Sequence, residues 1–278
     1  MAIICRDYKL LFIQVPATGC SSISKVLIEK LGGEKLPEKD IMLAGKYKLA
    51  GEKHNTLKQL VGFGLITQPE LESYLTFGTV RNPFDRFASA YQRYLSSWWT
   101  KMIESDDPNC PANRVGSAYR QRYVNNVQRQ IQLAREEGFE TWLSRKILIP
   151  QRLDRRLKFG FKRWLRKQPL FLTKSSVKMN IAYPFINGVD RVIRYEHLEQ
   201  DFNQVLSQVG IDEHIHIPHT NKTPGKKSYR TQYSPKARAF VEQELATELA
   251  TFKYAFDGLV AGEENPLGLP SVKSEVES

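Results

Sequence analysis

The sequence predicts an α/β fold in which a mostly parallel central sheet is flanked by helices on both faces. A nearly continuous apolar run at Lys9–Val15 and further β-type runs at Tyr74–Val80 and Val189–Tyr195 predict buried strands. A loop and then apolar residues at helical spacing follow each run, which is the alternation typical of a parallel sheet. The composition, with 41% hydrophobic and 26% charged residues, excludes a fibrous, collagen-like or wholly disordered chain.

The first strand is followed by a short loop and a helix. Pro and Gly in Pro16–Cys20 end the strand, and Ser21 or Ser22 is a typical helix N-cap. Gly32 ends the predicted helix, whose apolar face is formed by Ile23, Val26, Leu27 and Leu31.

The second strand runs into Arg81-Asn82-Pro83, and Pro83 stands where a first helical residue is expected. One face of this helix carries Phe84, Phe87, Ala88, Tyr91 and Leu95. A further helix is expected from about Ser117 to Glu137, with Gly138 as its end. The third strand leads into a helix through Phe202, Val205, Leu206 and Val209.

Basic residues exceed acidic residues, 41 to 30, for a net charge of +11. Such a surplus predicts a polyanionic partner: a nucleotide, a nucleic acid, an acidic glycan or a lipid surface. Residues 110–180 hold 17 Lys and Arg against 4 Asp and Glu, so we expect a basic, mostly helical insertion there. Residues 261–278 carry a net charge of −3 without periodicity and are expected to form a disordered acidic tail behind a single domain spanning 1–260.

Three cysteines, Cys5, Cys20 and Cys110, match neither a metal-ligand spacing nor a disulfide framework, which favours a reducing compartment. Charged residues interrupt the first 15 positions, so no signal peptide or membrane span is expected. These features predict a cytoplasmic protein, with peripheral membrane association as the alternative.

Two strand-to-helix loops carry groups that suit a phosphate. In Val15–Ser22, Gly19 permits a tight turn and Thr18, Ser21 and Ser22 supply hydroxyls at a helix N-terminus. No Gly-Lys-Ser/Thr sequence closes this loop, so it is not the phosphate loop of ATPases and kinases. A plain β–α turn is the alternative interpretation.

The second loop pairs Arg81, at the end of a strand, with Ser89, about two turns into the next helix. A guanidinium and a hydroxyl together suit a phosphate monoester. Alternatively, Arg81 pairs with a carboxylate and Ser89 is an ordinary helix residue.

These segments resemble the sulfotransferases. LLFIQVPATGCSSI is similar to their 5′-phosphosulfate loop. TFGTVRNPFDRFASAYQRYL resembles their 3′-phosphate motif at Val80, Arg81, Asn82, Pro83, Arg86, Ser89 and Tyr91. VDRVIRYEHLEQDF and KYAFDG resemble segments of the carbohydrate-type branch.

The resemblance implies a P-loop-like α/β fold and transfer of a sulfuryl group from 3′-phosphoadenosine 5′-phosphosulfate (PAPS) to a hydroxyl or amine. It assigns the 5′-phosphosulfate to Thr18, Gly19, Cys20, Ser21 and Ser22, and the 3′-phosphate to Arg81 and Ser89. No metal is expected, so the alternating His214, His216 and His219 are interpreted as outward-facing side chains.

One position departs from the family pattern. Ala17 stands where the family has a lysine that neutralises charge on the leaving oxygen. Lys25 and Lys53 are candidate substitutes. Cys20 replaces a glycine and is interpreted as a small buried residue.

His54 is the predicted general base, because an imidazole accepts a proton near neutral pH and Lys-His-Asn-Thr resembles a segment of the carbohydrate-type branch. Glu52 is the fallback. A surface histidine without a catalytic role is the alternative.

In 145–174 basic side chains alternate with Leu, Phe and Trp, which predicts an acceptor-side region facing an anionic or lipid-linked glycan, or an anionic membrane. A solvated basic face is the simplest alternative. Three functions therefore remain: a sulfotransferase acting on a carbohydrate or glycolipid, a catalytically weakened relative that binds nucleotide or glycan, and a nucleic-acid-binding protein. The last leaves both loops unexplained, so a nucleic-acid partner is disfavoured.

Overall fold

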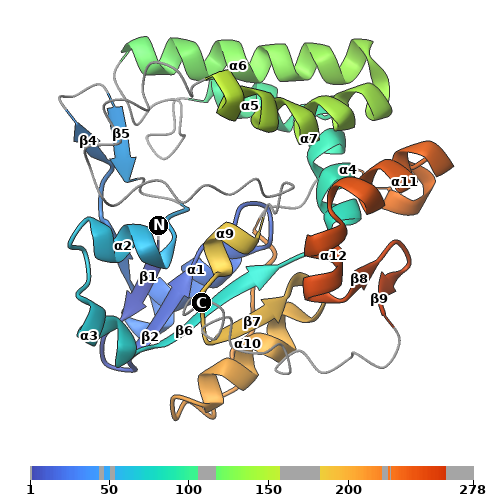
Figure 1. Cartoon of the computed structure of the whole chain (residues 1–278). Helices are drawn as coiled ribbons and strands as arrows, with labels where there is room; N and C mark the ends of the chain where they lie inside the picture. Colours follow the sequence, from blue (N-terminus) through green and yellow to red (C-terminus); the bar gives the residue numbers. More distant parts are fainter. Residues whose placement is uncertain are drawn as a thin grey trace. The chain divides into compact units, whose positions relative to one another are not determined.

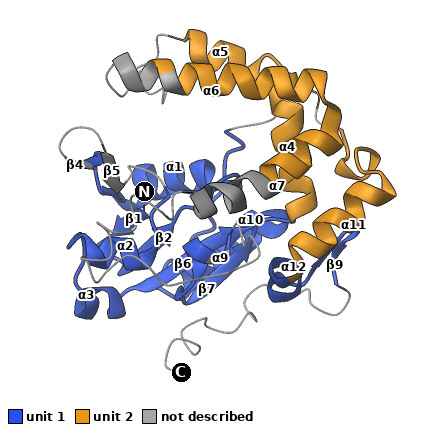
Figure 2. Cartoon of the chain, turned by 45° about the horizontal axis from the view of Figure 1, so that its top comes forward, with its two compact units in different colours: residues 1–82, 180–221, 247–278 blue, residues 83–179, 222–246 orange. Residues whose placement is uncertain are grey.

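The computed structural model describes residues 2–43, 47–50, 54–105, 117–156, 182–220, 225 and 227–260. The chain divides into two compact units, coloured in Figure 2. Unit 1 comprises 1–82, 180–221 and 247–278, and unit 2 comprises 83–179 and 222–246. The predicted acidic tail, Glu52, Lys53 and most of the basic segment 145–174 lie outside the described residues.

Unit 1 is built on a five-stranded sheet with the strand order β3-β1-β2-β6-β7 (Figure 1). Its strands are β1 (Ala2–Cys5), β2 (Leu10–Ile13), β3 (Glu34–Leu36), β6 (Leu75–Val80) and β7 (Arg191–Arg194). The pairs β2–β6 and β6–β7 are parallel, whereas β1 runs antiparallel to both β2 and β3. The mostly parallel α/β sheet is therefore confirmed, with an antiparallel edge.

The sequence analysis missed strand β1. The charged residues Arg6, Asp7 and Lys9 that interrupt the N-terminal apolar run form the turn between β1 and β2. Lys9 adopts a positive φ of 49° there, which lets Cys5 pair directly with Leu10.

Helices α1 (Cys20–Leu31) and α10 (Leu198–Ser207) pack on one face of this sheet around Phe12, Phe77 and Ile193. Because successive strand residues face opposite sides, Gly78 points to the other face. A β-carbon at Gly78 would lie only 2.9 Å from the side chain of Ile186 in α9 (Tyr183–Ile186), so helix and strand approach closely. Burial of Leu10–Ile13 is complete, as expected between two covered faces.

The remaining described elements of unit 1 surround this sheet. They are β4 (Ile41–Leu43), β5 (Tyr47–Ala50), α2 (Leu57–Gly62), α3 (Gln68–Glu72), the 3-10 turn η1 (Tyr195–His197), β8 (Tyr254–Ala255) and β9 (Gly258–Leu259). Helix α12 (Ala246–Phe252) begins at the last residue of unit 2 and otherwise belongs to unit 1.

The described part of unit 2 is helical. It holds α4 (Pro83–Leu95), α5 (Trp98–Glu104), α6 (Ser117–Glu136), α7 (Gly138–Arg156), the 3-10 turn η2 (Tyr229–Thr231) and α11 (Pro235–Glu244). Pro83 is the first residue of α4, as predicted, and Gly138, at a φ of 74°, is the first residue of α7, just after the end of α6 at Glu136. Tyr91 packs edge-on against Phe139, with ring centroids 5.1 Å apart, and its hydroxyl donates to the Ala134 carbonyl.

Within the described residues, none of the helices is both long and apolar enough to traverse a bilayer.

Candidate functional site

The loop between β2 and α1 lies at the carboxyl end of a parallel strand (Figure 1). Gly19, at a φ of 82°, is the N-cap of α1 and makes no side-chain cap hydrogen bond. The expected Ser21 or Ser22 cap is therefore wrong, because left-handed backbone at Gly19 already turns the chain into the helix. Its carbonyl instead accepts from the Ser22 N–H at 3.0 Å.

The N-terminus of α1 is a suitable anion site. Its first turn holds no acidic side chain, so the positive end of the helix dipole faces the loop without an internal counter-charge. Gly19 is also closely packed: a β-carbon there would lie 3.0 Å from side-chain carbons of Tyr195 and Leu198. A side chain at this position would be strained by the left-handed backbone and would require Tyr195 or Leu198 to shift.

The three predicted hydroxyls of this loop have different surroundings. Thr18 is fully buried; its hydroxyl donates to the Val15 carbonyl at 2.9 Å and also hydrogen-bonds the Thr79 hydroxyl. Ser22 hydrogen-bonds the Thr220 hydroxyl at 2.9 Å, whereas Ser21 is exposed in the first turn of α1. Thr18 thus joins the loop to β6. The role of all three hydroxyls toward a phosphosulfate stays a prediction.

Arg81 extends from the end of β6 to this same loop. Its Nη1 donates to the Ala17 carbonyl at 3.2 Å, and the guanidinium carbon lies 4.3 Å from the ring centroid of Tyr195. Only 8% of Arg81 is exposed. The structure therefore brings the predicted 3′-phosphate arginine and the predicted 5′-phosphosulfate loop together.

Tyr195 is a site residue that the sequence analysis did not single out. It ends the predicted strand Val189–Tyr195, and β7 lies directly beside β6 in the sheet. Because ligands of open α/β sheets bind beyond the carboxyl ends of strands, this position was the available signal.

His54 also lies at this loop. Its Nδ1 is 3.1 Å from the carbonyl oxygen of Gln14, the residue before Val15, and its ring packs edge-on against Phe185. A carbonyl oxygen only accepts hydrogen bonds, so a hydrogen bond at this contact requires the proton on Nδ1. The structure therefore brings the predicted base to the first phosphate loop.

Of the two candidate substitutes for the family lysine, the structure describes only Lys25. Lys25 contacts Glu29 in the next turn of α1, with 3.9 Å between the ammonium and the carboxylate, and Lys53 lies outside the described residues. Ala17 is exposed with a φ of 63°. Cys20 is 8% exposed, in agreement with its interpretation as a small buried residue.

Ser89 belongs to unit 2, whereas Arg81 belongs to unit 1. It lies in α4, six residues after Pro83, and is 6% exposed. Its predicted contact with a 3′-phosphate stays a prediction.

The His-rich segment is bound to α10. The Glu199 carboxylate accepts a hydrogen bond from the Ile217 N–H and contacts the rings of His214 and His216. The hydrogen bond from Ile217 is the main reason why the pKa of Glu199 is lowered to about 2. Ile215 and Ile217 are buried and the two histidines are exposed, which confirms the predicted alternation. In the part of the chain that the structure describes, His, Cys, Asp and Glu form no group of three that could hold a metal ion.

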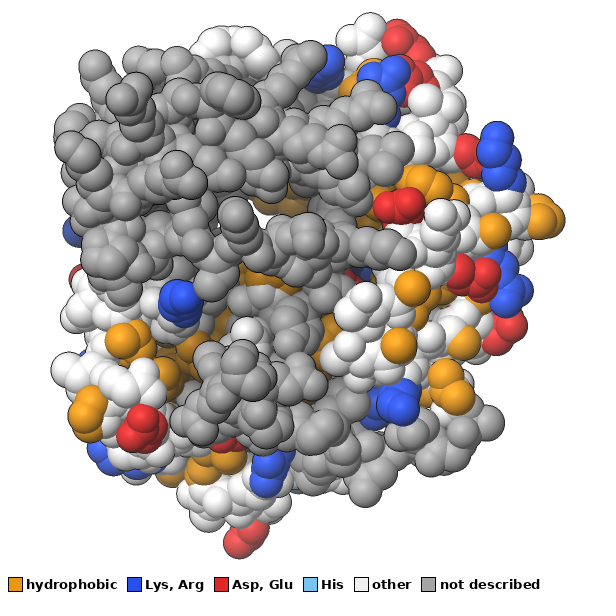
Figure 3. All heavy atoms as spheres, in the orientation of Figure 1, with side chains coloured by type: hydrophobic (Ala, Val, Ile, Leu, Met, Phe, Trp, Pro, Cys, Tyr) orange, Lys and Arg blue, Asp and Glu red, His pale blue; other side chains and the backbone are white. Residues whose placement is uncertain are grey.

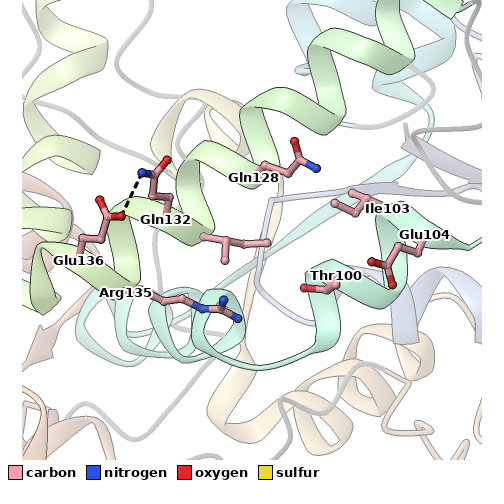
Figure 4. A pocket seen from close by; sticks show the side chains of 8 residues that line it. Thr100, Ile103, Glu104, Gln128, Gln132, Arg135 and Glu136 are labelled. Carbon is pink, nitrogen blue, oxygen red and sulfur yellow. Dashed lines mark hydrogen bonds between the residues drawn. The ribbon is translucent and has the colours of Figure 1, made fainter.

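A polar pocket of about 380 Å³ lies between α5 and α6 of unit 2 (Figure 4). Figure 4 shows Gln132 hydrogen-bonded to Glu136 along one wall. The other lining residues are Thr100, Ile103, Glu104, Gln128, Ile131 and Arg135. Two isoleucines, Ile103 and Ile131, form the apolar part of this lining.

The face seen in Figure 3 shows basic and acidic side chains interspersed among the described residues.

Comparisons with known proteins agree with this geometry. The model of the sulfotransferase family matches residues 1–255. The chain is 23% identical over 218 residues to carbohydrate sulfotransferase 11 of Mus musculus, covering 77% of this chain and 54% of that protein. It is 26% identical over 226 residues to carbohydrate sulfotransferase 10 of Rattus norvegicus, with the same two shares. The chain thus spans about half the length of the curated relatives it matches. No solved structure gives a significant match.

Proposed function

The chain belongs to the sulfotransferase family, and from that premise we propose that it transfers the sulfuryl group of PAPS to a hydroxyl or amine of a carbohydrate or glycolipid. The observation that carries the proposal is that Arg81 and His54 both contact the loop 14–19, at Ala17 and Gln14, ahead of the N-terminus of α1. Similarity to two carbohydrate sulfotransferases supports the acceptor class.

The residues present fit a nucleotide that carries two separate anionic groups, a 5′-phosphosulfate and a 3′-phosphate. The N-terminus of α1 and the loop before it suit the 5′-phosphosulfate, and the largely buried Arg81 guanidinium suits the 3′-phosphate. PAPS supplies an activated sulfuryl group, whose bond to the bridging oxygen breaks as the acceptor oxygen or nitrogen bonds to sulfur. Most of the acceleration is then expected from in-line positioning and charge stabilisation.

His54 serves as general base in this proposal. Its Nδ1–H is directed to the Gln14 carbonyl, so Nε2 takes the proton that leaves the acceptor. The backbone hydrogen bond keeps the tautomer and the ring orientation unchanged between turnovers.

A second candidate function rests on Ala17. The leaving oxygen lacks the ammonium that the family pattern supplies, and this favours a relative that binds nucleotide or glycan with little turnover. Localisation in the cytoplasm, with peripheral contact at an anionic membrane, is part of the proposal for either function.

The nucleotide site is tested by calorimetry with 3′-phosphoadenosine 5′-phosphate. Arg81→Ala is expected to weaken binding by roughly 10- to 100-fold, because it removes a charge-assisted contact. The matched control is Arg191→Ala, at the amino end of β7, which should bind as the unmodified chain does. Equal affinity in both variants contradicts the proposal.

Turnover is tested by transfer of labelled sulfate from PAPS to a panel of carbohydrate and glycolipid acceptors. His54→Ala should lower kcat by roughly 100-fold or more while nucleotide affinity stays nearly constant. Nucleotide binding without transfer to any acceptor would favour the weakened relative. Unchanged kcat in His54→Ala would exclude His54 as the base.

A further inference from the structure

The turn after β7 contacts both predicted phosphate loops. Tyr195 packs on the Arg81 guanidinium and beside Gly19, and the next residue, Glu196, contacts the residue after Arg81. Sequence segments more than 100 positions apart therefore meet within two consecutive residues of η1.

The Glu196 carboxylate accepts two hydrogen bonds from different parts of the chain. Oε1 accepts from the Asn82 backbone N–H at 2.9 Å, and Oε2 accepts from the Tyr254 hydroxyl at 2.7 Å. In this arrangement both partners donate, and each carboxylate oxygen accepts one hydrogen bond. A glutamine would supply only one acceptor.

Strand β8 holds the same loop from a second side. The Asn82 side-chain amide donates to the Ala255 carbonyl at 2.9 Å, and Ala255 adjoins Tyr254. Asn82 is 3% exposed, and Tyr254 is 4% exposed. Burial is the main cause that raises the pKa of Tyr254 well above its usual value, so the phenol remains protonated and continues to donate.

These contacts fix the backbone where the arginine side chain begins. The Asn82 N–H is part of the peptide unit that links Arg81 to Asn82, and Glu196 holds this unit directly. Movement of the peptide by 1 Å would shift the guanidinium relative to the Tyr195 ring and the Ala17 carbonyl. A carboxylate that holds this peptide, as Glu196 does, therefore suits a site that depends on the accurate placement of one cation.

We propose that Glu196 is a positioning residue for Arg81, and that Glu196 confers discrimination for the 3′-phosphate of the nucleotide without touching it. The inference rests on the proposed function, because it assumes that Arg81 binds a 3′-phosphate. The inference adds Glu196 to the proposed nucleotide site, where Tyr254 and Ala255 of β8 hold Glu196 and Asn82 in place.

The test compares affinities for 3′-phosphoadenosine 5′-phosphate and for adenosine 5′-phosphate, which lacks the 3′-phosphate. The dissociation constant for adenosine 5′-phosphate, divided by that for 3′-phosphoadenosine 5′-phosphate, measures recognition of the 3′-phosphate alone. Glu196→Gln is expected to lower this ratio by roughly tenfold, because one acceptor is lost and the loop shifts. Affinity for adenosine 5′-phosphate should remain within about twofold.

Glu199→Gln is the matched control. Glu199 lies three residues further on and also binds a backbone N–H, that of Ile217, but it has no hydrogen bond to Asn82. Its variant should retain the ratio of the unmodified chain. An equal fall in both variants would indicate general damage to the turn and would overturn the proposal.

A double-variant cycle separates positioning from an independent contact. If Glu196 acts through Arg81, Glu196→Gln should have no further effect on the ratio in a chain that already carries Arg81→Ala. Additive losses would overturn the proposal. Tyr254→Phe provides a milder variant should Glu196→Gln fail to fold, and it should lower the ratio severalfold, since it removes only one of the two donors. An unchanged ratio in Tyr254→Phe would then contradict the positioning role of Glu196.

The two levels of the proposal fail in different ways. If the unmodified chain shows no preference for the 3′-phosphate and Arg81→Ala changes nothing, the proposed function fails and this inference falls with it. If the preference exists and depends on Arg81 but is unaffected by Glu196→Gln, only the positioning role is wrong.

Discussion

Ala17 leaves the loop between β2 and α1 without a charged side chain at the position where the family pattern has a lysine. Its carbonyl accepts from Arg81, so a guanidinium already lies beside the loop, at a different angle from a side chain rooted at position 17. The exposed methyl group leaves room for a longer side chain, and the left-handed backbone already carries a β-carbon. Ala17→Lys therefore adds a charge without a new steric cost at Cβ.

Ala17→Lys is expected to raise kcat for sulfate transfer by roughly 10- to 100-fold, because an ammonium near the leaving oxygen stabilises the charge that develops there. The measurement is kcat with saturating PAPS and acceptor. Ala17→Gln is the control of similar reach without charge and should leave kcat nearly unchanged. Equal rates for both variants would mean that Arg81 or another cation already fills this role.

At the scale of elements, the first turn of α10 contains a buried carboxyl group. Asp201 is fully buried and accepts a hydrogen bond from the Arg194 N–H at 2.8 Å. Burial is the main cause that raises the pKa of Asp201 from 3.8 to about 6. The folded chain therefore retains a proton that the unfolded chain has released between those two values.

The free energy of unfolding should consequently fall as the pH rises from about 4 to about 6, and the full cost of the ionised Asp201, on the order of 3 kcal/mol, is present above that window. Asp201→Asn keeps an acceptor for the Arg194 N–H and should flatten this pH dependence. The measurement is urea unfolding at pH 4, 5, 6 and 7. Exposed Asp212, changed to Asn, is the control, and an unaltered slope in Asp201→Asn would contradict the assignment.

The three strands β2, β6 and β7 and the helices that follow them could be predicted, because burial and helix signals coincide in these segments. The run Lys9–Val15 contains β2, and Pro83 begins α4, since apolar continuity and proline each act locally. The N-cap of α1 could not be predicted from Ser21 and Ser22, because the left-handed Gly19 depends on packing against Tyr195 and Leu198.

The site was predictable only in part for the same reason. Arg81 and His54 were identified from residue type and resemblance, but their meeting at one loop is a tertiary property. His54 reaches Gln14 through a left-handed backbone at a φ of 63°, which the polar segment around it does not indicate. Glu196 has an ordinary surface-helix sequence context, and only the distance to Asn82 shows its contact.

At the scale of the whole molecule, the concentrated charge and the proposed nucleotide site occupy different stretches of sequence. Residues 110–180 carry a net +13, whereas Arg81, His54 and the loop 14–19 lie outside them. We propose that the surplus serves the acceptor or a membrane surface rather than the nucleotide. These two contributions can be separated by charge reversal.

Changing Arg152, Arg155 and Arg156 together to Glu should raise KM for an anionic glycan acceptor by roughly tenfold at low salt, with a smaller effect at high salt. Nucleotide affinity should stay within about twofold. The control changes the exposed Lys30, Lys35 and Lys58 of unit 1 to Glu, which alters net charge equally. If both triple variants raise KM to the same extent, net charge alone is responsible.

The parallel pairing of β6 with β7 has a consequence for synthesis. Val80 pairs with Arg194, and more than 100 residues, including most of unit 2, are made between these two strands. While the chain emerges from the ribosome, one edge of β6 stays without its strand partner until residue 194 appears. Such late closure slows folding and leaves an apolar strand edge available for association. A nascent chain interrupted before β7 should therefore require chaperone protection.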